Sequence, residues 1–210
     1  MTVDLQRRYI YLAAILLSLL FSVWRIVGVD LINNDGAIYL MAALGDEPSK
    51  QHLHNWLFYS YLIGLLSGAS GLSLEWSAHL VNLVLDGVLV VAFLRVADLF
   101  GAGSRVLFWA AVVIISVPYL MENRGEIIRG HGYWAFSMVA FSYDVKLYRC
   151  FSWGSLLGWS IGMLLATLFR IEGLVIAVLA PLGLLLNTGY GWSDRLRHLV
   201  KTWSPLLVAG

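Results

Sequence analysis

The sequence predicts an all-α membrane protein that crosses the bilayer several times. Of its 210 residues, 60% are hydrophobic and 13% are charged, and the mean hydropathy is +0.77. A soluble domain is nearer half apolar and about a quarter charged. Long apolar runs also alternate with short polar connections. We therefore predict an all-α polytopic membrane protein with six complete transmembrane helices and the start of a seventh.

The apolar runs differ in how well they fit a bilayer. The first lacks the short core and small-residue cleavage site of a secretory signal, so we interpret it as an uncleaved span. Trp56–Gly68 is short for a crossing and is typical of interfacial or re-entrant segments. Pro181 is expected to kink the last complete span. The runs are Tyr9–Gly28, Trp56–Gly68, Trp76–Phe100, Val106–Leu120, Gly132–Lys146, Trp153–Phe169 and Leu174–Leu186, and a further one opens near Trp203.

The basic residues indicate the orientation, because Lys and Arg collect in cytoplasmic loops. If Trp56–Gly68 does not cross, most basic clusters fall on one side, together with the amino terminus. If it does cross, every later cluster moves outside. We therefore predict a cytoplasmic amino terminus and no crossing by Trp56–Gly68. The cytoplasmic residues would be Arg7, Arg8, Arg95, Arg105, Lys146, Arg149, Arg195, Arg197 and Lys201.

Two global features restrict the function only weakly. The net charge of +1 comes from scattered basic residues, so the sequence gives no indication of a nucleic-acid partner. Cys150 is the only cysteine, which excludes a disulfide within the chain. The sequence contains no P-loop and no dinucleotide-binding fingerprint.

The first outer connection, Val29–Glu75, contains juxtamembrane helical segments and a polar cluster. Asn34, Asp35 and Gly36 precede a helix-like run to Leu44. Asn34 or Asp35 could cap that helix. Asp35 could instead be a carboxylate at the membrane surface, with a proton affinity tuned by flanking apolar helices for general-base work. Both interpretations stay open on sequence alone.

Two further outer connections are rich in charge. Within Met121–Tyr133, Arg124 and Arg129 could bind a phosphate, since guanidinium groups match phosphate oxygens. The alternative is an ordinary solvated loop with internal ion pairs. At the next junction, Arg170 and Glu172 could simply be snorkelling charges at a helix end. Together these connections could line one site for a charged lipid.

Polar residues also occur inside the second predicted span. His79, Asn82 and Asp86 share one helical face. We expect them to form interhelical hydrogen bonds rather than to take part in catalysis. His52 and His54, without a third ligand, are weak evidence for a metal site.

Four segments, in this order, resemble the GT-C superfamily of membrane glycosyltransferases, in its protein O-mannosyltransferase and aminoarabinose-transferase-like branch. The segments are Asn34-Asp35-Gly36-Ala-Ile-Tyr39-Leu, Trp56-Leu-Phe-Tyr59-Ser-Tyr61-Leu-Ile, Ile127-Ile-Arg129-Gly-His131-Gly-Tyr-Trp-Ala-Phe and Phe169-Arg170-Ile-Glu172-Gly173-Leu. The resemblance covers nearly all of residues 1–210, which would form one transmembrane domain. Such enzymes are normally longer, so we expect this chain to be an amino-terminal portion.

The resemblance implies transfer of a sugar from a polyprenyl-phosphate carrier to a glycan, lipid or protein acceptor. The reaction would occur at the outer, periplasmic face of a bacterial inner membrane. Asp35 matches the first-loop acid, which in some members works with a divalent metal. Many relatives have Asp after the second-loop Arg, whereas this chain has Gly130 and His131, so Glu126 or His131 could substitute. The substrate-binding candidates are Asn34, Tyr39, Arg124, Arg129, Arg170 and Glu172.

Two other functions fit a polytopic protein with outer charges. A transporter or flippase for polyprenyl-linked lipids should carry charged groups along a central cavity through several spans. A non-catalytic membrane assembly subunit would keep the fold without a working site.

Overall fold

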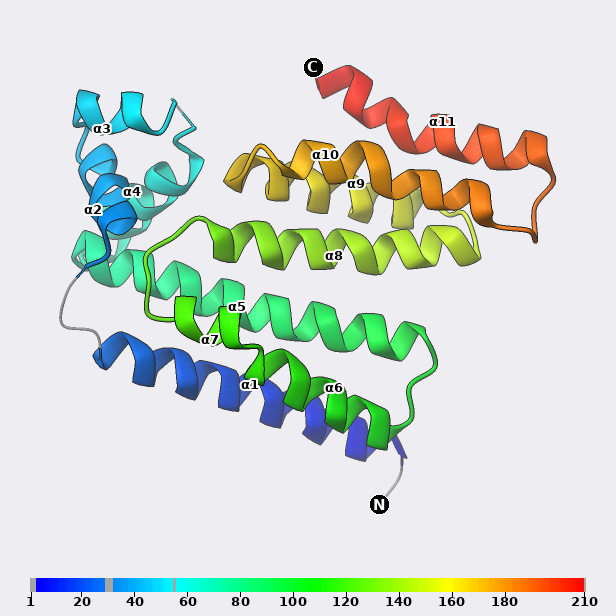
Figure 1. Cartoon of the computed structure of the whole chain (residues 1–210), viewed down its shortest axis with the longest axis horizontal. Helices are drawn as coiled ribbons and strands as arrows, with labels where there is room; N and C mark the ends of the chain where they lie inside the picture. The colour runs from blue at the N-terminus through cyan, green and yellow to red at the C-terminus, as the bar shows by residue number, and fades with distance from the viewer. Residues whose placement is uncertain (1–2, 29–31, 55, 210) are drawn as a thin grey trace.

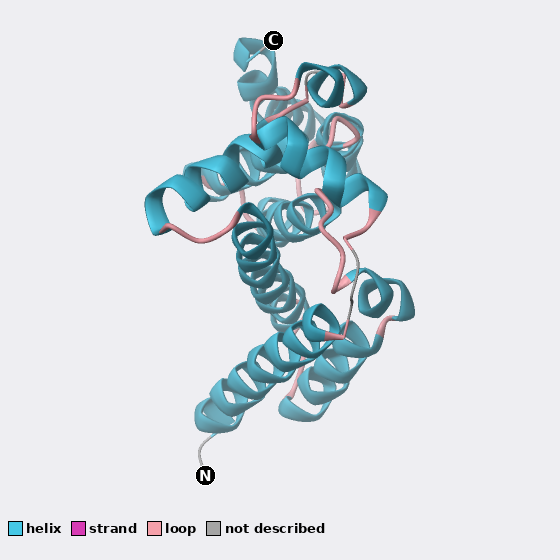
Figure 2. Cartoon of the chain, turned by 90° about the vertical axis from the view of Figure 1, so that its left-hand side faces the viewer, coloured by secondary structure: helices cyan, strands magenta, loops and turns pink. Residues whose placement is uncertain are grey.

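The computed structural model describes residues 3–28, 32–54 and 56–209. Of the described residues, 82% are helical and none lies in a strand, as Figure 2 shows. The prediction of an all-α fold is therefore confirmed. The elements are α1 Val3–Val27, α2 Asn34–Ala43, α3 Glu47–His52, α4 Phe58–Ser70, α5 Leu74–Leu99, α6 Ser104–Ser116, α7 Pro118–Asn123, α8 Gly130–Arg149, α9 Trp153–Phe169, α10 Gly173–Leu179, the 3₁₀ helix η1 Ala180–Leu186 and α11 Trp192–Ala209.

Prolines divide two of the predicted runs. The expected continuous helix Val106–Leu120 breaks at Val117, which has an extended ψ of 117° between α6 and α7. Pro118 follows directly, and proline disfavours helical backbone in the residue before it. At Pro181 the α-helix gives way to η1, which confirms the expected local distortion.

The last helix begins earlier than the apolar pattern indicated. The further run was expected to open near Trp203, but α11 already begins at Trp192. Its first turns alternate charged and apolar residues, including Asp194 and Arg197, and it packs against η1. This part of the helix is therefore amphipathic.

The long helices lie side by side in one stack. Figure 1 shows α1 and α6 at one edge, followed by α5, α8, the α9–α10 layer and α11. One buried cluster joins α1, α5, α6 and α8 to the short helices α2 and α4, and a second joins α8, α9 and η1. The α8–α9 contact is close, because a Cβ on Gly162 would lie 3.0 Å from Ala140.

The connections gather at two opposite ends of the stack (Figure 1). The basic end holds the start of α1 and the connections α5–α6, α8–α9 and η1–α11. The α2–α4 end holds α2, α3 and α4 with the connections α7–α8 and α9–α10. The helix α4 has 13 residues and lies with α2 at this end. That Trp56–Gly68 does not cross the membrane stays a prediction.

Many large apolar side chains are exposed on the long helices. Two described helical segments, Leu5–Val27 and Leu74–Leu99, are long and apolar enough to span a membrane. On α1, Leu16, Leu20 and Trp24 are each more than 60% exposed. Soluble monomers rarely expose contiguous apolar patches of more than a few hundred Å². These features indicate association with a membrane.

Candidate functional site

A polar cavity of about 230 Å³ lies at the α2–α4 end. It combines one carboxylate, one guanidinium group, one phenol and two imidazoles from three segments of the chain. Three of the predicted site residues, Asp35, Tyr39 and Arg129, therefore lie together. The lining residues are Asp35, Ile38, Tyr39, His52, Leu53, His54 and Arg129.

Two hydrogen bonds between the Asn33 side chain and the Ile127 backbone hold the start of α2 against the α7–α8 connection. The amide N–H of Ile127 donates to Oδ1 of Asn33 at 3.0 Å, and the Asn33 amide donates to the carbonyl of Ile127 at 3.5 Å. Gly36 permits this approach, because a Cβ there would lie 2.9 Å from Cβ of Ile127. These contacts bring the first turn of α2 beside Arg129.

The capping interpretation of Asn34 and Asp35 is wrong. Asn33 occupies the N-cap position of α2, and its side chain is used for Ile127 rather than for a cap hydrogen bond. Asp35 lies inside the first turn with an exposed side chain, and Asn34 is exposed beside it. The Asp35 carboxylate can therefore interact with a ligand without uncapping the helix.

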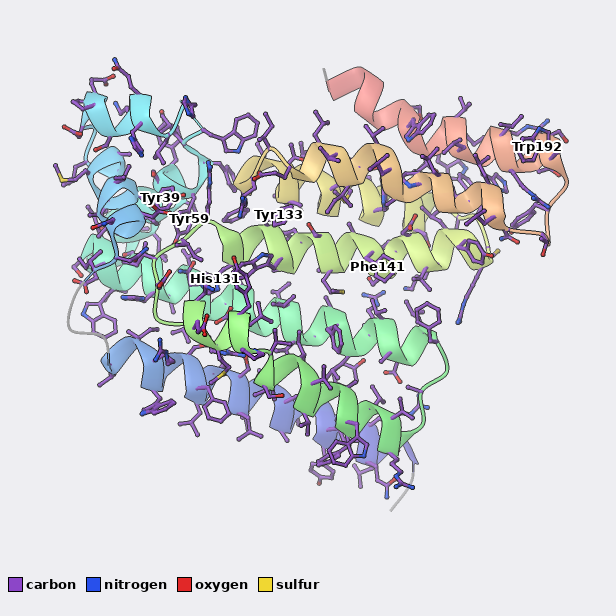
Figure 3. The ribbon with its side chains drawn as sticks, viewed as in Figure 1. Tyr39, Tyr59, His131, Tyr133, Phe141 and Trp192 are labelled. Carbon is purple, nitrogen blue, oxygen red and sulfur yellow. The ribbon has the colours of Figure 1, made fainter. Side chains whose placement is uncertain are left out.

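Tyr39 lies at the buried wall of the cavity, next to Tyr59 (Figure 3). The two rings meet edge to face with centroids 5.2 Å apart. Burial raises the pKa of the Tyr39 hydroxyl, and Arg129 and Arg170 oppose this shift less strongly. The hydroxyl therefore stays protonated at neutral pH and can donate a hydrogen bond to a ligand. Arg129 lines the same cavity, whereas Arg170 lies outside its lining.

The predicted interhelical hydrogen bonds of α5 support this wall. The Tyr59 hydroxyl donates to Oδ1 of Asn82 at 2.9 Å, and the Asn82 amide donates to the Glu126 carbonyl at 3.1 Å. The expectation is thereby confirmed for Asn82, but it is wrong for His79, whose Nδ1 is buried without a hydrogen-bond partner among the described residues. Glu126, a candidate second acid, has a half-buried side chain in the α7–α8 connection, outside the cavity lining.

Arg170 and Glu172 lie in the α9–α10 connection as a partly exposed ion pair. Nη2 of Arg170 is 2.5 Å from Oε1 of Glu172, and the guanidinium lies 5.6 Å from the ring centroid of Tyr133. The hydrogen bond from Arg170 lowers the pKa of the Glu172 carboxyl. Glu172 therefore stays ionised well below neutral pH.

An aromatic cluster fixes the α9–α10 connection to the rest of the α2–α4 end. Phe169, directly before Arg170, is 1% exposed. Its ring packs on those of Phe58, Tyr59 and Phe136 at centroid distances of 5.2, 6.0 and 5.8 Å. A Cβ on Gly132 would overlap the Phe169 ring, so α8 also needs glycine at this contact.

The other two candidates, Arg124 and His131, lie in a buried network centred on Asp86. Nδ1 of His131 is 2.7 Å from Oδ1 of Asp86, and the Ser22 hydroxyl donates to Oδ2 at 2.8 Å. Arg124 is 4% exposed, with Nη1 3.7 Å from the same carboxylate. The expectation that Asp86 joins helices is confirmed. Figure 3 shows His131 set back from the Tyr39–Tyr59 pair.

Arg124 and His131 are also bonded to the chain around them. Nη1 of Arg124 donates to the carbonyl and hydroxyl of Ser18 at 3.0 and 2.8 Å, and to the Ser22 hydroxyl at 2.8 Å. Nε2 of His131 lies 3.2 Å from the carbonyl of Asn123. These contacts assign both residues a role in joining α1, α5 and α8.

Some residues of the Asp86 network and of the polar cavity were not predicted from the sequence. Ser18 and Ser22, one turn apart in α1, were not predicted as partners of Arg124, because two serines in an apolar span do not by themselves indicate a partner.

His52 and His54 line the cavity, and His54 has a positive φ of 51°. Within the described ranges, no group of three or more His, Cys, Asp or Glu side chains is placed to share a metal ion.

Comparisons of the chain with protein-family models, with curated proteins and with solved structures found no match.

We predict that Arg124→Ala lowers stability rather than substrate affinity. Removing one partner of a buried ion pair typically costs about 3–5 kcal/mol of the free energy of unfolding. Thermal unfolding of the protein in nanodiscs should show a clearly lower midpoint. Arg105→Ala, which removes an exposed guanidinium at the basic end, is the matched control and should be nearly silent. An Arg124→Ala protein of unchanged stability would return Arg124 to the list of ligand-binding candidates.

Proposed function

We propose that the chain is a membrane glycosyltransferase that moves a sugar from a polyprenyl-phosphate donor to an acceptor. The supporting observation is the polar cavity in which Asp35, Tyr39 and Arg129 meet at the end of an apolar helix stack. A lipid-linked donor needs this combination, since its tail requires an apolar environment and its phosphate requires cationic donors. The resemblance of the four quoted segments to the GT-C superfamily points to the same chemistry.

In the proposed topology, α1, α5, α6 with α7, α8, α9 and α10 with η1 cross the membrane, and α11 contains the start of a seventh span. The basic end faces the cytoplasm, because the helix ends there carry Arg105, Lys146 and Arg149. The helices α2, α3 and α4 then lie at the outer surface. The cavity would face the periplasm of a bacterial cell at the level of the lipid head groups.

The proposed reaction assigns roles to three residues of the cavity, Asp35, Tyr39 and Arg129, and to Arg170 outside its lining. The Asp35 carboxylate accepts the proton of the acceptor hydroxyl. The acceptor oxygen then bonds to the anomeric carbon of the sugar, and the carrier phosphate leaves with the electrons of the broken bond. Arg129 and Arg170 bind the phosphate oxygens and stabilise their charge. The protonated Tyr39 hydroxyl donates a further hydrogen bond.

The position of the charges favours transfer over lipid flipping. A flippase needs charged groups along a path through the spans, accessible to the moving head group. The charged cluster inside this bundle, Asp86 with Arg124 and His131, is closed by its own hydrogen bonds. A non-catalytic subunit would also have this structure. The effect of substituting Asp35 on transfer distinguishes an enzyme from such a subunit.

Topology can be tested by cysteine labelling in a Cys150→Ala background. Cysteines at Ser49 and Ser73 should both react with an impermeant thiol reagent added outside intact cells, because α4 does not cross. A cysteine at Ser104, at the basic end, should react only after the membrane is permeabilised. Opposite labelling of Ser49 and Ser73 would place α4 across the membrane and divide the proposed site.

Asp35→Asn should abolish most of the transfer activity and leave the protein folded. Asp35 is not the N-cap, so the substitution removes only its charge and a helix-dipole contribution of about 0.3–1 kcal/mol. Transfer from a defined polyprenyl-phosphate sugar should fall by roughly a hundredfold or more.

Asp46→Asn is the matched control for this change. Asp46 lies in the same outer connection, where its carboxylate accepts from the Ser49 amide at 2.9 Å as the N-cap of α3. Asparagine caps nearly as well as aspartate, so this variant should transfer normally. Full activity of Asp35→Asn would exclude the general-base role, and Glu126 would be the next residue to test.

Arg129→Ala and Arg170→Ala should each weaken use of the donor. A hydrogen bond to a charged group contributes about 1.5–3 kcal/mol, so each loss should raise the donor KM roughly ten- to a hundredfold. Lys50→Ala, which removes a cation paired with Glu47 in the outer connection, is the control. An unchanged donor KM in both arginine variants would leave them as interfacial charges without a role in binding.

A further inference from the structure

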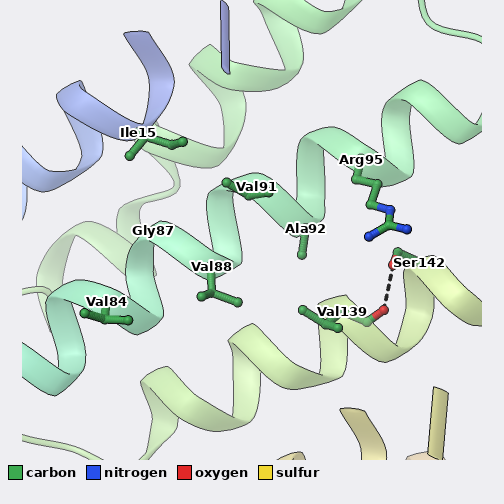
Figure 4. Close-up of a pocket in the computed structure, with 9 residues that line it drawn as sticks. All are labelled: Ile15, Val84, Gly87, Val88, Val91, Ala92, Arg95, Val139 and Ser142. Carbon is green, nitrogen blue, oxygen red and sulfur yellow. Dashed lines mark hydrogen bonds between the residues drawn. The ribbon is translucent and has the colours of Figure 1, made fainter. Parts of the chain in front are cut away.

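A second cavity, of about 330 Å³, lies toward the basic end between α1, α5 and α8. Figure 4 shows Ile15 of α1 and a row of α5 residues along it, with Val139 and Ser142 of α8 on the other wall. It shares no lining residue with the polar cavity at the α2–α4 end.

The cavity is an apolar groove that ends at a cation. Along α5 its lining runs from Val84 through Gly87, Val88 and Val91 to Arg95, all on one helical face. Val84 and Val91 are 59% and 37% exposed, so the groove opens at the surface of the bundle. Arg95 reaches from α5 toward α8 (Figure 4).

A second cation, Lys146, shares the Tyr143 ring with Arg95 near this end of the groove. The guanidinium of Arg95 and the ammonium of Lys146 lie 5.0 and 5.2 Å from the centroid of the Tyr143 ring. The ring is held from α9, because a Cβ on Gly158 would lie 2.6 Å from it. Because both lie beside this ring, the two cations are at most about 10 Å apart. Their combined positive potential favours a nearby anion.

Neither Asp98 nor Asp144, the carboxylates closest to these cations in the sequence, forms an ion pair with Arg95 or Lys146. Asp98, one turn after Arg95, is engaged by Arg7 at 3.3 Å and by the Tyr11 hydroxyl at 2.8 Å. Among the described side chains, neither Arg95 nor Lys146 forms an ion pair with a carboxylate. The end of the groove is therefore complementary to an external anion.

The length of the groove identifies the class of ligand. From Val84 to Arg95 the helix rises roughly 16 Å, at about 1.5 Å per residue. This is about half of the roughly 30 Å hydrocarbon core, the depth of one leaflet. An acyl chain lying along the groove would place its phosphate at Arg95 and Lys146.

We propose that this groove binds an anionic phospholipid of the cytoplasmic leaflet, with one acyl chain along α5 and the phosphate between Arg95 and Lys146. The leaflet follows from the proposed topology, whereas the binding itself does not depend on transferase activity. Anionic lipids are attracted to basic groups on the cytoplasmic side of membranes.

Lipid binding can be measured by native mass spectrometry of the purified protein, with phosphatidylglycerol and phosphatidylcholine of identical chains. Phosphatidylglycerol should bind more tightly. Arg95→Gln should weaken its binding by about tenfold, because a charged hydrogen bond is lost. The control Arg105→Gln, outside the groove at the same end, should leave it unchanged.

A substitution that fills the groove tests the acyl chain separately. A Cβ on Gly87 meets nothing within 4 Å, so Gly87→Leu occupies the groove without disturbing the protein. It should weaken binding of both lipids, whereas Gly68→Leu in α4, which also meets nothing within 4 Å, should not. Asp35→Asn should bind lipid normally, which separates this site from the transfer site.

Three outcomes would overturn the proposal. Phosphatidylglycerol binding unaffected by both Arg95→Gln and Gly87→Leu would exclude the groove. Glycerol phosphate competing as well as the intact lipid would exclude a role for the acyl chain. Polyprenyl phosphate displacing phosphatidylglycerol, in a manner sensitive to both substitutions, would assign the groove to the sugar carrier instead.

Discussion

The buried carboxylate of Asp86 is the interaction on which the arrangement of the α2–α4 end depends. An ionised carboxylate in an apolar interior is costly unless it is paired and hydrogen-bonded. In this protein its partners come from three places, namely Ser22 on α1, Arg124 in the α7–α8 connection and His131 on α8. The requirement to satisfy Asp86 therefore pulls a charged connection into the bundle and fixes its path.

That path determines where the outer cavity forms. Once Arg124 is anchored, Ile127 lies where its backbone can bond the side chain of Asn33. This contact positions the first turn of α2, and with it Asp35, beside Arg129. The buried network thus organises the cavity from behind without lining it. A substitution in the network should act on the cavity through structure, whereas a substitution in the cavity should act on the ligand alone.

The sequence predicted the helices well and the roles of the arginines only in part. Apolar runs located the long helices, because burial and lipid exposure both require continuous hydrophobicity. The interhelical role of Asn82 and Asp86 also followed from the cost of polar groups in a span. The sequence could not show which of Arg124 and Arg129 has a structural role and which can bind a ligand. Both lie in one connection, and they differ only in partners that are far away in the sequence. Arg124 meets Ser18 and Asp86, contacts that only the packed fold reveals.

The way each arginine is paired indicates which can bind an anion. Arg124 is bonded through Nη1 to buried acceptors, and releasing it would leave the Asp86 charge uncompensated, so a ligand cannot replace these partners at little cost. Arg170 is paired with an exposed Glu172, and such surface pairs contribute only about 0–1 kcal/mol. A phosphate can therefore replace that partner at little cost. Arg95, held over an aromatic ring beside a second cation, gains an anion without losing a carboxylate partner. The affinity for an external anion should accordingly be lowest at Arg124, higher at Arg170 and highest at Arg95. The more strongly an arginine is paired within the protein, the less it gains from an external anion.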